Sequence, residues 1–178
     1  TGGITMAKKA GKNSQGELAN KIAWVIGARG SLGSAIARRL ALAGAHVVMS
    51  SRSARDLKSV AKDIERVAPK RTSVAALDFT SRASVDRVAK SIVRAHGRID
   101  VLVNCTAAPI FGDFLKLTDE QWDTVLQSKL YGYMRSMRAV IPYMLAQGGG
   151  AIVNVSGRGG RQPTPAHRSE EHTSELQS

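Results

Sequence analysis

The feature that most constrains this chain is a glycine-rich turn between an apolar run and a helical pattern. The run Ile22–Ile26 predicts a buried strand, and apolar spacing over residues 34–43 predicts a helix. Between them lies the sequence Gly27-Ala28-Arg29-Gly30-Ser31-Leu32-Gly33. Glycines at such a junction let the chain reverse tightly and let backbone N–H groups approach a phosphate at the start of the helix. The sequence therefore predicts a nucleotide-binding strand–turn–helix unit, with a plain tight turn as the alternative.

The same alternation of strand and helix patterns continues along the chain. Strands are predicted at Ile22–Ile26, 47–50, 73–78, Val101–Asn104 and 151–156, and helices at 34–43, 53–67, 84–95 and 118–146, the last with a capping box at Thr118 and a kink near Pro142. Strands joined through helices by short links require a parallel sheet with helices on both faces. We therefore expect a doubly wound, three-layer α/β/α domain over residues 21–167. Residues 1–20 are polar and rich in Gly and Lys, which predicts a flexible arm.

Composition narrows the classes of function. The 178 residues carry a formal net charge of +12, but the basic residues are spread along the predicted helices and aromatic residues are only 4%. This pattern favours solvated helix faces over a nucleic-acid-binding surface, which needs massed charge and stacking platforms. No apolar run approaches the length of a membrane span, so no membrane partner is expected. The single cysteine, Cys105, argues against disulfides and a cysteine-cluster metal site and favours a cytoplasmic location without a bound metal.

The end of the second predicted strand suggests which nucleotide is bound. An NAD site usually has an acidic residue there to accept a hydrogen bond from the ribose 2′-OH. This chain has Ser51 followed by Arg52, and Arg29 of the glycine-rich turn is expected nearby. Guanidinium groups and a hydroxyl suit a 2′-phosphate, so we expect NADP(H) to be favoured over NAD(H). The alternative is that Arg52 is simply solvated at the end of a strand.

Two further strand ends are expected at the same edge of the sheet. Asp78, followed by Phe79, could accept a hydrogen bond from an adenine amino group, or could instead be the N-terminal cap of the next helix. Asn104, Cys105 and Thr106 are small or polar residues at the end of the fourth strand, where ligands of open α/β sheets bind. The alternative there is a hydrogen-bonding node at Asn104 and packing at Cys105. The predicted cofactor-binding residues are Gly27, Arg29, Gly30, Ser31, Leu32, Gly33, Ser51, Arg52, Asp78, Phe79, Asn104, Cys105 and Thr106.

Together these motifs resemble the short-chain dehydrogenase/reductase family over about residues 18–165. The family's Thr-Gly-x-x-x-Gly-x-Gly turn is similar to Ile26-Gly27-Ala28-Arg29-Gly30-Ser31-Leu32-Gly33, and its Asn-Asn-Ala-Gly motif is similar to the segment that begins at Asn104. The segments that begin at Trp122 and at Gly150 resemble its long helix and fifth strand. The resemblance implies a Rossmann-like fold and hydride transfer between NADP(H) and a small carbonyl or alcohol substrate. It also implies a homo-oligomer for the full-length protein.

The family's catalytic positions are only partly matched. Its catalytic Asn position holds Lys129, and its Ser-Ser pair aligns with Ser156 and Gly157. None of the chain's tyrosines has a Lys four residues later, so the family's Tyr-x-x-x-Lys motif is missing from these 178 residues. The resemblance thus leaves Ser156 and Lys129 as candidate catalytic residues; the alternatives are a capping serine and a lysine that extends to solvent. These departures keep open a second hypothesis, a non-catalytic NADP-binding or redox-sensing module.

The last eleven residues do not fit the pattern of the domain. The segment 168–178, RSEEHTSELQS, resembles the translation of a sequencing adapter. We therefore expect an artefactual tail, and a natural sequence that is a fragment without the family's C-terminal strands.

Overall fold

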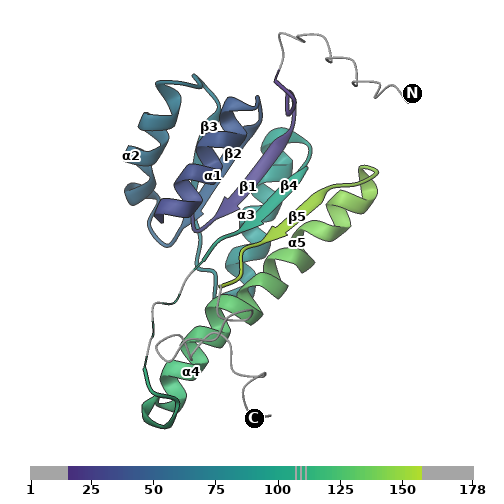
Figure 1. Ribbon diagram of the computed structural model, residues 1–178. Coiled ribbons are helices and arrows are strands. Elements are labelled where there is room, and N and C mark those ends of the chain that lie inside the picture. The colour runs from purple at the N-terminus through teal and green to yellow at the C-terminus, as the bar shows by residue number, and fades with distance from the viewer. Residues whose placement is uncertain (1–15, 107, 109, 111, 158–178) are drawn as a thin grey trace, which may run out of the picture.

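A parallel sheet forms the middle layer of the protein (Figure 1). The computed structural model describes residues 16–157 apart from 107, 109 and 111, and the fold concerns these residues. The five strands of the sheet lie in the order β3-β2-β1-β4-β5. Their bounds are β1 (Ile22–Ile26), β2 (His46–Ser51), β3 (Thr72–Ala76), β4 (Val101–Asn104) and β5 (Ala151–Asn154). This is the topology expected of a doubly wound sheet, and it confirms the predicted fold class.

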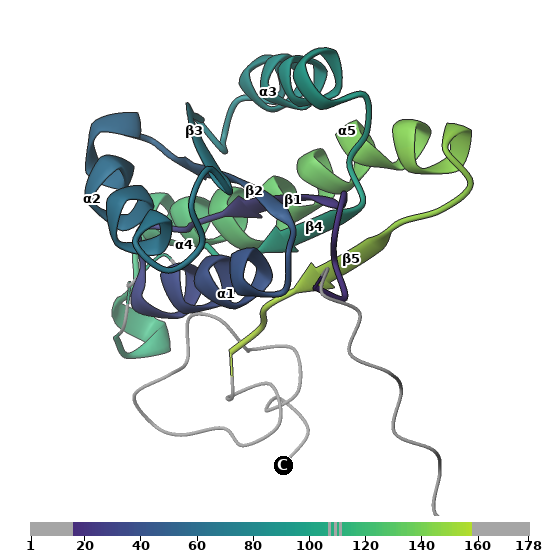
Figure 2. The same ribbon diagram turned by 90° about the horizontal axis from the view of Figure 1, so that it is seen from above.

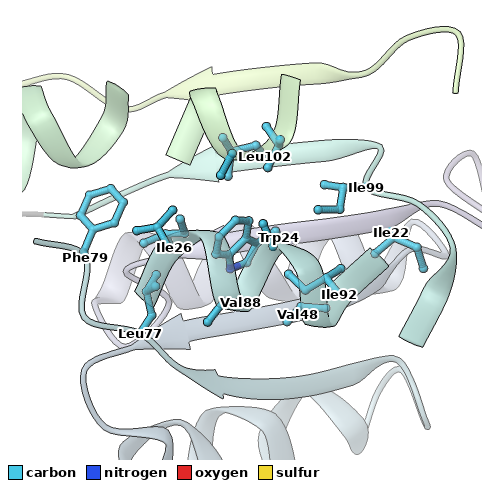
Figure 3. Close-up of a cluster of buried hydrophobic side chains, with 14 of the residues drawn as sticks. Ile22, Trp24, Ile26, Val48, Leu77, Phe79, Val88, Ile92, Ile99 and Leu102 are labelled. Atoms are coloured by element: carbon cyan, nitrogen blue, oxygen red, sulfur yellow. The ribbon is translucent and has the colours of Figure 1, made fainter. Parts of the chain in front are cut away.

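Helices cover both faces of the sheet, because side chains along each strand alternate between two cores (Figure 2). Ala23 and Val25 pack with α1 (Ser31–Leu42) and α2 (Ala54–Glu65). Trp24 and Ile26 instead pack with α3 (Arg82–His96) and α5 (Gly132–Ala146), as the close-up in Figure 3 shows for Val88 and Ile92 of α3. The buried Trp24 indole keeps a hydrogen-bond partner, since its Nε1 donates to Ser50 Oγ at 2.9 Å. The central strands are therefore fixed from both sides.

The long helix predicted at 118–146 is not regular. It starts with the predicted capping box at Thr118, whose hydroxyl accepts from the Gln121 amide. It then runs as α4 (Asp119–Leu126), a π-helical segment (Gln127–Tyr131) and α5, and α4 extends past the carboxyl end of the sheet (Figure 1). The change of helical geometry lies at this π-helical segment, well before Pro142, where the sequence suggests a kink. A short 3₁₀ helix, Phe114–Lys116, precedes α4.

The turn at residues 17–20 packs onto the domain. The Leu18 amide donates to the Ala43 carbonyl at 2.8 Å, and the Leu18 side chain contacts the core beneath α1. The end of the stretch expected to be a flexible arm is thus in contact with the sheet layer. Residues 1–15 and the predicted tail at 168–178 lie outside the described residues. Within the described part of the chain, the helices are too short or too polar to cross a bilayer.

Candidate functional site

The glycine-rich turn joins β1 to α1, and two of its three glycines are required by packing. Gly27 has a φ of +86°, and a Cβ at this position would overlap the Cys105 carbonyl. A Cβ on Gly33 would overlap the Gly27 carbonyl. Gly30 differs, because its φ is −68° and a Cβ there would approach nothing closer than 3.6 Å. Close packing of strand, turn and helix thus depends on Gly27 and Gly33 but not on Gly30.

Among the described residues, no side chain caps the start of α1. Gly30 is the N-cap residue and makes no side-chain capping bond, and the first turn contains no acidic residue. Ser31 and Leu32 follow at the exposed start of the helix, where Leu32 is 53% exposed. Helix α1 begins three residues earlier than the sequence predicts, so Ser31, Leu32 and Gly33 belong to its first turn. An uncapped helix N-terminus of this kind suits an anion, because backbone N–H groups and the helix dipole point the same way.

Cationic side chains gather where β2 ends and α2 begins. Arg52 is exposed directly after the strand, and the half-buried Ser51 donates its hydroxyl to the Ser53 carbonyl at 2.7 Å. Arg29 reaches across from the glycine-rich turn, with its Nε 3.7 Å from Asp56 Oδ2 in the first turn of α2. The glycine-rich turn and the residue after β2 therefore each carry an exposed arginine, and that of the turn reaches the start of α2.

The end of β3 places Asp78 and Phe79 in different surroundings. Asp78 is exposed, and its carboxylate accepts from the Thr80 hydroxyl at 2.7 Å and the Thr80 amide at 3.0 Å. These bonds, the hydroxyl one first, lower the pKa of Asp78. Asp78 does not cap α3, since Ser81 is the N-cap residue and accepts from the Ser84 amide. Hence that alternative is wrong.

Phe79 is a core residue. Its side chain is 7% exposed, and its ring lies 6.1 Å from that of Tyr133. A Cβ on Gly132 would overlap the Phe79 ring, so α5 needs a glycine at this crossing. Figure 3 shows Phe79 in the cluster that also holds Ile26. Only the backbone of Phe79, not its side chain, remains available to a ligand.

Asn104 is the hydrogen-bonding node of β4. It is fully buried, its Nδ2 donates to Asn154 Oδ1 at 2.8 Å, and its Oδ1 accepts from the Ser136 hydroxyl at 2.8 Å. This one side chain links β4, β5 and α5. The structure thus shows the structural role that was the alternative to cofactor contact.

The residues after Asn104 lie close to the glycine-rich turn and to the π-helical segment. The Cys105 amide donates to the Ile26 carbonyl at 2.9 Å, and burial raises the pKa of its thiol. The Thr106 hydroxyl donates to the Ser128 carbonyl at 2.9 Å. Lys129 is half-buried, with its Nζ 5.8 Å from the centre of the Tyr133 ring. Ser156 is exposed two residues beyond β5.

Several residues at this edge carry roles that the sequence interpretation did not assign. Thr80, two residues after an Asp, follows the pattern of a side-chain turn and could have been found from it. Ser136 is a polar residue in the apolar register of α5, which is also a usable signal. The pairing of Arg29 with Asp56 has no local signal, because only the tertiary fold brings α2 to the glycine-rich turn. Among the described residues, no cluster of His, Cys, Asp and Glu could hold a metal ion.

Comparison with known proteins agrees with this geometry. The family model described as short chain dehydrogenase matches residues 21–169. The human protein named dehydrogenase/reductase SDR family member 4 is 34% identical over 157 residues, which cover 88% of this chain and 56% of that protein. A metagenomic short-chain oxidoreductase solved in complex with NADP has 32% identity and a TM-score of 0.78, over 83% of this chain and 66% of that one. An NAD⁺-bound xylitol dehydrogenase has 25% identity and a TM-score of 0.82, over 86% and 59%.

The matched proteins are longer than this chain. The chain spans little more than half of the length of the human relative. The family model nevertheless matches the whole predicted domain, residues 21–167, from β1 to beyond β5. The solved structures bind NADP in one case and NAD⁺ in the other, in keeping with a family of NAD(P)-dependent oxidoreductases. The chain belongs to the short-chain dehydrogenase/reductase family.

Proposed function

We propose that this chain is the cofactor-binding part of an NADP(H)-dependent oxidoreductase that interconverts a carbonyl and an alcohol. The observation that carries the preference for NADP(H) is the exposed Arg52 directly after β2, together with Arg29 of the glycine-rich turn, which reaches Asp56 at the start of α2. The position where an NAD site keeps an acidic residue holds Ser51. A 2′-phosphate would gain charge-assisted hydrogen bonds at this place, whereas a free 2′-OH would find no carboxylate acceptor on the strand end.

The residues of the glycine-rich turn fit a dinucleotide. The space that Gly27 and Gly33 leave beside the turn, and the uncapped amides at the start of α1, suit a pyrophosphate. We expect Asp78, whose pKa is lowered by its bonds from Thr80, to accept a hydrogen bond from an adenine amino group. Asn104 supports the site indirectly by fixing the ends of β4 and β5. NADP(H), when bound, would supply or accept the hydride.

The test of this proposal is cofactor selectivity. We expect Arg52→Ala to weaken NADPH binding by roughly ten- to a hundredfold and to leave NADH binding nearly unchanged, because only NADPH carries the phosphate. Arg94→Ala, an exposed arginine on α3, is the matched control for net charge and should change neither affinity. Titration calorimetry gives both dissociation constants. Equal losses for the two cofactors would show that Arg52 does not recognise the phosphate.

The rival proposal is a non-catalytic NADP-binding or redox-sensing module. Its support is Lys129 and Gly157 at two positions where the family resemblance implies catalytic Asn and Ser. Without a Tyr-x-x-x-Lys pair among these 178 residues, we expect no turnover by this chain alone, since a positioned general acid contributes about 10²–10⁴-fold. A version extended by the gene's downstream sequence, assayed for NADPH oxidation with a panel of carbonyls, separates the proposals. Turnover supports the enzyme, and NADPH binding without turnover supports the sensor.

A further inference from the structure

Lys129 occupies a segment that is fixed to the carboxyl ends of two strands. It lies within the π-helical segment Gln127–Tyr131, a geometry that is rare and frequent at functional sites. The bond from Thr106 to the Ser128 carbonyl ties this segment to the end of β4. The Tyr133 hydroxyl is within hydrogen-bonding distance of the Thr106 carbonyl (3.3 Å) and the Val155 carbonyl (2.9 Å), so it joins the same place to the end of β5. The backbone that carries Lys129 is therefore held against the sheet edge where ligands of such folds bind.

The ammonium contacts the aromatic ring of Tyr133, whose hydroxyl joins these two strand ends. Its Nζ lies 5.8 Å from the centre of the Tyr133 ring, within the range of a cation–π contact. Its charge also acts on Cys105, where it lowers the pKa of the thiol against the larger, opposite effect of burial. Lys129 is therefore a half-buried residue whose charge acts on Tyr133 of α5 and on the thiol of the residue that follows β4.

We propose that Lys129 binds an anionic oxygen of the substrate, and that the substrate is a carbonyl compound that carries a carboxylate, such as a 2-oxo acid. The assignment to a substrate rests on the proposed function. The phosphates of a dinucleotide have their own donors at the start of α1, on the β1–β2 side of the site. Lys129 lies on the β4–β5 side and supplies a separate positive charge there. A half-buried ammonium favours a charged partner over a neutral one, because attraction is stronger where water is partly excluded.

Cys105 provides a reporter that needs no turnover, because it is the only cysteine of the chain. Its alkylation by the neutral reagent iodoacetamide is followed between pH 6 and 10 in this chain and in Lys129→Gln. Removal of the ammonium should move the rate profile to higher pH. Lys129→Arg should restore it, and Lys116→Gln, an exposed lysine before α4, should leave it unchanged. Circular dichroism of each variant checks that the fold is kept.

Oxamate, an analogue of a 2-oxo acid that is not reduced, then probes the anion site with and without NADPH. We expect oxamate to slow alkylation of Cys105 by shielding the thiol and by neutralising the nearby charge. Lys129→Gln should raise the oxamate concentration needed by on the order of tenfold or more, and Lys129→Arg by much less.

Inorganic pyrophosphate is the comparison ligand. An effect of pyrophosphate that requires Lys129, with no effect of oxamate, would assign Lys129 to the cofactor phosphates and overturn the proposal. Equal protection by oxamate in Lys129→Gln and in the unchanged chain would overturn it too. Failure of NADPH selectivity at Arg52 would contradict the proposed function but not the oxamate result, so the two failures are distinguishable.

Discussion

The two halves of the sheet differ in how completely they are enclosed. In the β1–β2 half, every residue of β1 is buried, and β1 has β2 and β4 as neighbours and helices on both faces. In the β4–β5 half, β5 pairs only with β4 among the described strands, and three of its four residues are exposed. The contrast teaches that the glycine-rich turn lies in the enclosed half, where Gly33 packs against the turn itself and Gly27 packs against the Cys105 carbonyl just after β4. Among the described residues, the other half leaves one edge of β5 without a neighbouring strand, and Val153 on this strand is 47% exposed.

The largest expected effect tests the packing of the β1–β2 half. Gly27→Ala forces a side chain into a left-handed backbone and into the Cys105 carbonyl. Strain and overpacking together should lower the free energy of unfolding by about 2–5 kcal/mol. Gly30→Ala is the matched control in the same turn and should change it by less than about 0.5 kcal/mol. Urea titrations give the free energy of unfolding of both variants. Similar losses in Gly27→Ala and Gly30→Ala would show that the contact with the Cys105 carbonyl is not the cause.

A second, smaller effect tests the hydrogen bonds that hold the β4–β5 half together. Asn104→Leu removes the side chain that bonds to Ser136 and Asn154, and we expect a loss of about 1–3 kcal/mol of unfolding free energy. Asn154→Ala removes a bond at an exposed position and should cost less. Amide exchange measured alongside should show faster opening of β5 than of β1 in Asn104→Leu. Uniform acceleration across the sheet would show that Asn104 does not specifically hold the second half.

Local patterns explain what could be predicted from the sequence, and distant contacts explain what could not. The bounds of β1 and β4 follow from local apolar runs that end at a glycine or a polar residue, and the predicted bounds of both strands agree with the structure. Apolar spacing predicts the start of α1 three residues too late, because Ser31, Leu32 and Gly33 show no apolar periodicity. The π-helical segment could not be predicted, since Thr106 holds it from a distant part of the chain.

The same holds for the site residues, whose place at the sheet edge can be predicted but whose tertiary contacts cannot. Parallel strands place their ends at one edge, so Arg52, Asp78 and Asn104 could be assigned to that edge from the sequence alone. Which side chains stay free there depends on tertiary contacts. Asn104 is engaged by Ser136 and Asn154, and Phe79 is buried because Gly132 lets α5 approach. Neither arrangement has a signal within a few residues of the site.

A third prediction concerns how the stability of the β1–β2 half depends on pH at the start of β2. The rings of His46, the first residue of β2, and His96, the last of α3, lie 4.5 Å apart, and His46 Nε2 is 3.1 Å from Ser73 Oγ. Burial, followed by the charges of His96 and Arg71, lowers the pKa of His46, while a Lys70 backbone bond and Glu65 act in the opposite direction.

The sign of the effect follows from proton uptake. Below about pH 6.5 the unfolded chain binds a proton at His46 that the folded chain resists, so stability is highest above this pH and falls as the pH drops. We expect His46→Gln to reduce the difference in urea midpoint between pH 8 and pH 5.5, and His96→Gln to reduce it in part. Lys90→Gln on α3 controls for lost surface charge. An unchanged difference in His46→Gln would remove this residue as the cause.

The smallest effect on stability, and the one that most directly tests the open half, is expected at Val153. Val153→Lys places a charge on β5, which pairs with β4 alone among the described strands, and it should change the free energy of unfolding by less than about 0.5 kcal/mol. It should nevertheless reduce self-association measured by light scattering, because charged side chains on an edge strand oppose pairing with a second chain. Leu145→Lys is the matched control, since Leu145 is 75% exposed but lies on α5 rather than on a strand. If association depends on the strand edge, only the Val153 variant suppresses it. If both variants suppress it equally, general apolar exposure is responsible, and the open edge of β5 has no special role.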